Sequence, residues 1–131
     1  MLIFRLDSNR VGGRVLDSNS ETVRTPRVWL LVGEKRGDNA QVINLARAIG
    51  WNHEEKQIFM KPKWREGKPR VRARIDHVDL EKSDPFEAPW PDLIITAGRR
   101  LCSVALFIKR ASGGKTRIVL IGKPRCPLDQ I

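Results

Sequence analysis

The chain has 131 residues, enough for one domain, and 40% of them are hydrophobic, so it can bury a core and is not generally disordered. No apolar run approaches the ~20 residues that span a bilayer, and the N-terminus lacks the apolar segment of a secretory signal. The net charge of +10 indicates anionic partners: phosphorylated compounds, nucleic acid or an acidic membrane surface.

Residues 1–26 contain many arginines and serines and no regular hydrophobic pattern. We expect them to form a loosely ordered N-terminal tail, and residues 27–131 to form the folded lobe. Within this lobe the continuous apolar run at residues 28–32 is typical of a strand buried on both faces of a parallel sheet.

A helix is expected from residue 39 to 49. Asp38 is its predicted N-cap, Gln41 completes a capping box, and Gly50 stands where helices commonly end. An ordinary strand-to-helix loop with a good cap would explain this pattern by itself.

The loop between this strand and helix also has the composition of an anion site. Lys35 and Arg36 supply positive charge, Gly37 allows close approach of the backbone, and the helix start supplies unpaired amides. The loop matches neither the dinucleotide pattern GxGxxG nor the phosphate loop GxxxxGK[ST], so no specific cofactor is predicted.

Order is hard to predict between residues 61 and 91. Residues 53–60 alternate weakly and are expected to form a second strand, after which prolines interrupt regular structure. Between residues 61 and 74, seven basic side chains accompany one tryptophan and a single acidic residue. Such a run either contacts an anionic surface or forms a solvated loop. The candidates for contact with a membrane or another anionic surface are Lys61, Lys63, Trp64, Arg65, Lys68, Arg70, Arg72 and Arg74.

A second strand–loop–helix unit follows, with a strand at residues 92–97 and a helix that ends near residue 112. Arg99 and Arg100 stand at the start of this helix, where positive charge opposes the macrodipole, so we expect them to bind an anion or to form a salt bridge. A strand at residues 116–121 completes a crossover unit. The fold class is therefore α/β with an open parallel sheet, which brings both loops to one edge.

Catalytic and metal-binding groups are few. Glu34 and Asp38 are the weak candidates for a general base, although Asp38 serves equally well as a cap. Cys102 and Cys126 match no metal spacing, so no metal site is predicted and a reduced, partly buried thiol is expected at Cys102. Nothing in the cysteine content demands an oxidising compartment, and a cytoplasmic location is the simplest.

The two loop regions resemble signatures of the mitochondrial fission ELM1 family. Residues 28–41, with the helix segment 45–50, resemble the opening of that family, and residues 91–100 resemble its second signature. Residues 112–117 are also similar. The resemblance covers roughly residues 27–128.

Bacterial members of the family look like two-lobed GT-B glycosyltransferases, whereas plant members recruit a dynamin-like fission protein to mitochondria. The resemblance implies a Rossmann-like N-terminal lobe that lacks its donor-binding partner, so we expect a truncated chain that is incomplete as an enzyme. No cofactor is expected here, and a nucleotide sugar donor only with a second lobe. The residues implied to line the cleft between lobes are Gly33, Lys35, Gly37, Asn39, Gln41, Gly98, Arg99 and Arg100.

Three functions remain open at this point. The resemblance favours the acceptor-side lobe of a GT-B-like glycosyltransferase that acts on a phosphorylated or lipid-linked acceptor, peripheral to the inner face of a membrane. The first alternative is a non-catalytic interaction protein of the fission-factor type. The second is a nonspecific basic nucleic-acid binder, for which the sequence contains no recognised module.

Overall fold

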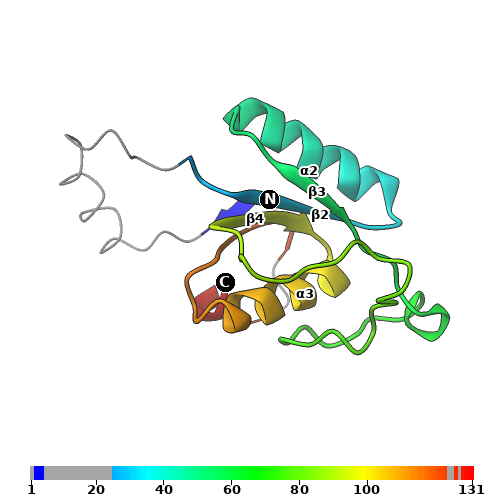
Figure 1. Cartoon of the computed structure of the whole chain (residues 1–131). Helices are drawn as coiled ribbons and strands as arrows, with labels where there is room; N and C mark the ends of the chain where they lie inside the picture. Colours follow the sequence, from blue (N-terminus) through cyan, green and yellow to red (C-terminus); the bar gives the residue numbers. More distant parts are fainter. Residues whose placement is uncertain (1, 5–24, 124–125, 127) are drawn as a thin grey trace, which may run out of the picture.

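The computed structural model describes residues 2–4, 25–123, 126 and 128–131, and Figure 1 shows their arrangement. These residues form a five-stranded sheet in the order β1-β5-β4-β2-β3. The strands are β1 (Leu2–Phe4), β2 (Val28–Val32), β3 (Glu54–Gln57), β4 (Leu93–Ala97) and β5 (Arg117–Ile121). Strands β3, β2, β4 and β5 are parallel, and β1 pairs antiparallel with β5 at the edge. The predicted Rossmann-like α/β fold with an open parallel sheet is confirmed.

Two long helices cover opposite faces of the sheet (Figure 1). Helix α2 (Arg36–Ile49) packs against β2 and β4, and helix α3 (Arg99–Ala111) packs against β4, β5 and β2. Each helix follows one parallel strand and starts at its carboxyl end. The two helices therefore begin at the same edge of the sheet.

The apolar run of β2 fills two cores at once. Trp29 and Leu31 belong to the cluster under α3, whereas Leu30 and Val32 belong to the cluster under α2. Successive side chains of a strand point to opposite faces, so a strand covered on both sides must be apolar throughout. All five residues of β2 are buried, as the sequence predicts.

The strand predicted at residues 53–60 is shorter, because only Glu54–Gln57 pair with β2. Its polar residues form an edge of the sheet, where charged side chains discourage pairing with another chain. The chain then turns into the core: Ile58 is fully buried and donates its backbone N–H to the Val32 carbonyl at 2.8 Å.

The segment at residues 58–91 is irregular but anchored. It contains a short 3₁₀ helix, η1 (Pro62–Trp64), and buries Val71 and Val78 against the core under α3. Met60 forms an isolated bridge with Val78. Part of the basic run is therefore attached to the core and is not a freely solvated loop.

The predicted capping box of the first helix is wrong. Helix α2 begins at Arg36, with Lys35 at the N-cap and no side-chain cap bond, so Asp38 lies inside the first turn. The C-terminal prediction is confirmed, because Gly50 adopts a left-handed conformation with a φ of 81° and donates to the Ala46 carbonyl at 3.1 Å.

The tail predicted for residues 1–26 falls largely outside the described residues. The described part of it includes Leu2–Phe4, which forms β1 beside β5. In the described part of the chain, no helix has the length and hydropathy needed to cross a bilayer.

Candidate functional site

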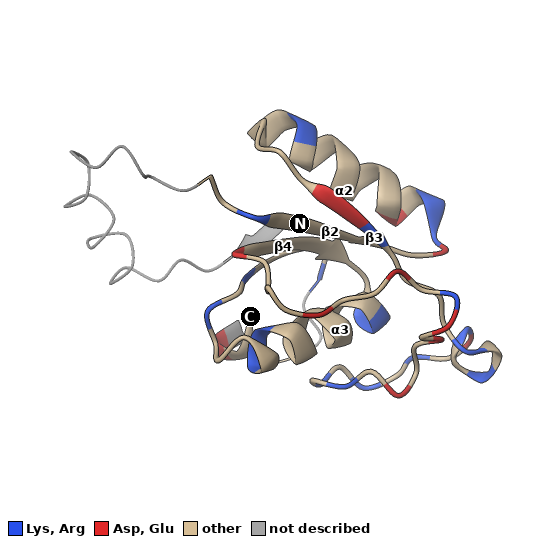
Figure 2. Cartoon of the chain, in the orientation of Figure 1, with Lys and Arg blue, Asp and Glu red and all other residues tan. Residues whose placement is uncertain are grey.

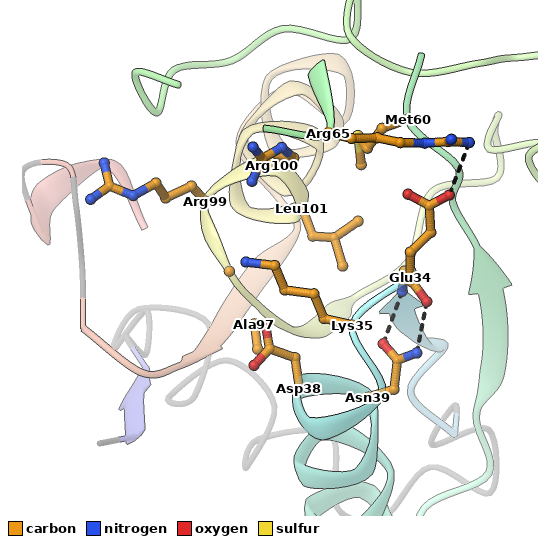
Figure 3. A pocket seen from close by; sticks show the side chains of 12 residues that line it. Glu34, Lys35, Asp38, Asn39, Met60, Arg65, Ala97, Arg99, Arg100 and Leu101 are labelled. Atoms are coloured by element: carbon orange, nitrogen blue, oxygen red, sulfur yellow. Dashed lines mark hydrogen bonds and ion pairs between the residues drawn. The ribbon is translucent and has the colours of Figure 1, made fainter. Parts of the chain in front are cut away.

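A pocket of about 160 Å³ lies where β2 and β4 end and α2 and α3 begin (Figure 3). The residues that line it are Gly33, Glu34, Lys35, Asp38, Asn39, Met60, Arg65, Ala97, Gly98, Arg99, Arg100 and Leu101. The structure thus brings together six of the residues predicted for ligand binding: Gly33, Lys35, Asn39, Gly98, Arg99 and Arg100. Gly37 and Gln41 are not part of the lining, whereas both candidate bases, Glu34 and Asp38, are.

The first loop is held in shape by Asn39. Its side-chain amide donates to the Gly33 carbonyl at 2.7 Å, and its Oδ1 accepts from the Gly33 N–H at 2.9 Å. Both ends of the amide are thus engaged within the loop (Figure 3). Asn39 therefore shapes the site, and the ligand-binding role implied for it stays a prediction.

Close packing of the two loops depends on two glycines. A Cβ at Gly33 would lie 3.3 Å from Leu101 Cδ1 of α3, and a Cβ at Gly98 would lie 3.3 Å from the Asp38 carboxylate. Gly98 also has a φ of 92°, which side chains other than glycine rarely adopt. These two positions let the loops approach each other at the pocket.

Both helices present their N-terminal ends to the pocket. The first backbone bonds run from the Asn39 N–H to the Lys35 carbonyl and from the Cys102 N–H to the Gly98 carbonyl, each at 3.0 Å. The amides before these residues form the positive ends of the two helix dipoles. The exposed Lys35 side chain extends across the pocket toward the start of α3 (Figure 3), so charge and dipoles together favour an anion.

The two arginines of the second loop differ in their contacts. Arg100 donates Nε to the Trp64 carbonyl and Nη2 to the Gly67 carbonyl, the latter at 3.0 Å. Its guanidinium thus bonds to two backbone carbonyls, and no ion pair of Arg100 is found among the described residues. The ligand contact expected of it stays a prediction. Arg99 extends away from Lys35 (Figure 3) and lines a second, much smaller recess together with Lys123.

Arg65 is the lining residue that the sequence assigned elsewhere. It was expected at an anionic surface, yet its Nη2 lies 3.4 Å from Glu34 Oε1 at the rim of the pocket. No periodicity or motif links positions 34 and 65. Only the tertiary fold, which folds the segment after β3 back over the start of α3, brings them together.

Most of the other predicted surface-contact residues are exposed. Lys61, Lys63, Lys68, Arg70 and Arg72 are open to solvent, and basic residues recur along this segment in Figure 2. The Trp64 ring instead packs against the core under α3, with the Arg74 guanidinium 4.8 Å from its centre. Packing on that core leaves the exposed basic side chains as the groups available to an anionic surface.

The buried His77 links the segment that contains Trp64 to the start of α3. It is 2% exposed, its ring lies 5.8 Å from the Trp64 ring, and its Nε2 is 2.9 Å from the Arg100 carbonyl. Burial lowers the pKa of His77. A neutral ring that donates through Nε2 satisfies this geometry, so His77 is a packing residue and lies outside the pocket lining.

The described residues offer little for metal or thiol chemistry. Among them no group of three or more His, Cys, Asp or Glu side chains is close enough to hold a metal ion. Burial raises the pKa of the Cys102 thiol to about 12, which keeps it protonated at neutral pH.

Comparison with known proteins supplies the family. No curated protein and no solved structure shows significant similarity to this chain. Residues 36–131 match the sequence model described as Mitochondrial fission ELM1, a stretch that covers α2, the second loop and everything after it. Since this match spans well over half of the chain, the protein belongs to the mitochondrial fission ELM1 family.

Proposed function

We propose that this chain is the acceptor-side lobe of a GT-B-like glycosyltransferase and that its pocket binds the phosphoryl group of a phosphorylated or lipid-linked acceptor. The observation that carries the proposal is the convergence of two helix N-termini and Lys35 on one pocket. A phosphoryl group offers several oxygens to backbone amides and a lysine, and its charge is stabilised by both helix dipoles.

Catalysis would require more than this lobe. Glu34 and Asp38 line the pocket and can accept a proton from an acceptor hydroxyl, but the nucleotide sugar would be held by a second, donor-binding lobe. We therefore assign to this chain the binding and orientation of the acceptor, and we propose no cofactor for it.

The exposed basic side chains of residues 61–72 would hold the lobe against an anionic membrane, where a lipid-linked acceptor resides. Lys63 and Lys68 belong to this set and are open to solvent. Charges that lie near a lipid surface attract it at about 1 kcal/mol each. This would place the protein in the cytoplasm, peripheral to the membrane.

Isothermal titration calorimetry with inorganic pyrophosphate tests whether the pocket binds a phosphoryl group. We expect Lys35→Ala to weaken binding roughly tenfold, because it removes one charge-assisted contact. Lys63→Ala is the matched control: it also deletes one exposed lysine, but from outside the pocket lining. Absence of binding by the unmodified chain, or equal losses in both variants, would contradict the proposal. In that case an interaction protein of the fission-factor type would be the better assignment.

A further inference from the structure

We propose that Arg65 is a direct ligand contact of this pocket, that Arg100 positions it, and that Glu34 competes with the ligand for it. The inference deepens the proposed function and rests on it, because it assumes that the pocket receives an anionic group. It exchanges the roles that the sequence suggests, in which Arg100 binds the ligand and Arg65 meets a surface.

The Arg65 side chain can leave Glu34 and bind an anionic ligand in its place. Its pair with Glu34 spans 3.4 Å, and the two side chains remain 47% and 36% exposed. Water and salt screen an ion pair of this kind, so it contributes little to stability and opens readily. A phosphoryl group can replace the single carboxylate contact with two parallel hydrogen bonds to the guanidinium.

The Glu34 carboxylate stands where it can act as an internal competitor. Figure 3 shows its side chain turned toward Arg65 and away from the Lys35 ammonium. Arg65 and Lys35 both line the pocket but come from different segments of the chain. An anion bound near Lys35 would therefore draw Arg65 away from Glu34 and gain a second cationic contact.

Arg100 cannot easily serve as that second contact, since two of its donor groups are already used. Its Nε and Nη2 bond to the carbonyls of Trp64 and Gly67, the residues on either side of Arg65 and Glu66. These bonds fix the backbone of Arg65 relative to the start of α3. Trp64 adds a second fixed point through its packing against the core.

Pyrophosphate affinity of the full chain tests the contact. We expect Arg65→Ala to weaken binding roughly five- to tenfold. Lys63→Ala removes an equal charge two positions earlier and should change affinity by less than about twofold. Equal effects of the two substitutions would overturn the direct contact and leave only a general electrostatic attraction. Because Lys35→Ala reports on the pocket itself, its loss of binding alongside an unaffected Arg65→Ala would refute this inference and spare the proposed function.

Competition by Glu34 has a separate signature. Glu34→Gln should tighten pyrophosphate binding about two- to threefold when Arg65 is present, and by clearly less in the Arg65→Ala background. The same gain in both backgrounds would mean that Glu34 acts only through its charge, and the competition would be refuted.

The positioning role of Arg100 is tested by the same kind of cycle. Arg100→Lys keeps the charge but cannot bond both carbonyls in the same fork geometry. In the Arg100→Lys protein, we expect Arg65→Ala to reduce pyrophosphate affinity by less than half the factor that it does in the unmodified chain. A lower melting temperature with an unchanged Arg65 effect would show that Arg100 is merely structural, and would overturn its positioning role.

Discussion

At the residue scale, Asn39 fixes the shape of the first loop through its side-chain hydrogen bonds. It makes two hydrogen bonds with Gly33, whose carbonyl also accepts from Gln57 Nε2 at 3.1 Å. Gly33 thus connects the loop to α2 through Asn39 and to β3 through Gln57. Asp38, the residue predicted as the cap, lies inside the first turn of α2, whose N-cap is Lys35.

Adjacent substitutions separate these two roles. We expect Asn39→Ala to lower the free energy of unfolding by about 1–3 kcal/mol, because it leaves the Gly33 N–H and carbonyl without this side-chain partner. Asp38→Ala should cost only about 0.3–1 kcal/mol, the value of a negative charge in the first turn of a helix. Urea denaturation of the two variants measures both. A larger cost at Asp38 than at Asn39 would restore the capping interpretation.

At the scale of elements, the segment at residues 58–78 is fastened to α3 by a buried histidine. His77 reaches the Arg100 carbonyl through its side chain, while its backbone carbonyl accepts from the Lys61 N–H at 2.9 Å. Arg74, Asp76 and Arg100 are the charged groups that act on its ring. Burial, the largest influence, favours the neutral ring together with the two arginines, whereas Asp76 and the bond to the Arg100 carbonyl favour the protonated ring.

Acid should destabilise the folded protein through this buried histidine. The unfolded chain takes up a proton at His77 near the ordinary pKa of 6.5, whereas burial lowers the pKa in the folded protein. Unfolding is therefore favoured progressively as the pH falls below about 6.5, until the folded-state pKa is passed. The Asp76 carboxyl, whose pKa Arg74 lowers to about 2, loses its contribution only below its ordinary 3.8.

Melting temperatures recorded from about pH 7.5 down to about pH 5 measure this effect. We expect the decline to be shallower in His77→Gln, which keeps an N–H donor without a titrating ring. His53→Gln, a change at an exposed histidine, should leave the decline as it is. If His77→Gln declined as steeply as the unmodified protein, another group would be responsible.

At the scale of the whole molecule, the two cores explain the stability of the sheet. β4 contributes Ile94 to the cluster under α3 and Ile95 to the cluster under α2, and both are almost fully buried. The buried Thr96 hydroxyl donates to the Leu31 carbonyl at 3.0 Å and joins β4 to β2. The sheet is therefore a closely packed base from which both loops leave.

The net charge of +10 is also a property of the whole molecule, and it makes binding to anionic vesicles dependent on where the charge lies. We expect Lys63→Gln with Lys68→Gln to weaken binding to vesicles that contain acidic lipid roughly thirtyfold, at about 1 kcal/mol for each charge near the surface. Arg47→Gln with Arg110→Gln removes the same charge from exposed helix positions and is the control. Vesicle sedimentation measures the binding of both double variants. Equal losses of binding would show that net charge alone governs the interaction with the vesicles.

The sequence by itself determined the fold class and the edge of the sheet at which the two loops meet. The apolar run of β2, the glycine after α2 and the charged loop before α3 are local signals, because burial on both faces, helix termination and helix-end electrostatics each depend on neighbouring residues. They sufficed to predict parallel strands, two helices and a shared edge where both loops meet.

Only the tertiary structure decided which side chains face the pocket and what each one contacts. The ion pair of Arg65 with Glu34 and the bonds of Arg100 to Trp64 and Gly67 join positions more than thirty residues apart, through a stretch with no periodic pattern. Helix α2 likewise begins at Arg36, with no cap at Asp38, and the amide of Asn39 reaches back to Gly33. Contacts of this kind depend on the path of the folded chain, and local sequence preferences do not encode that path.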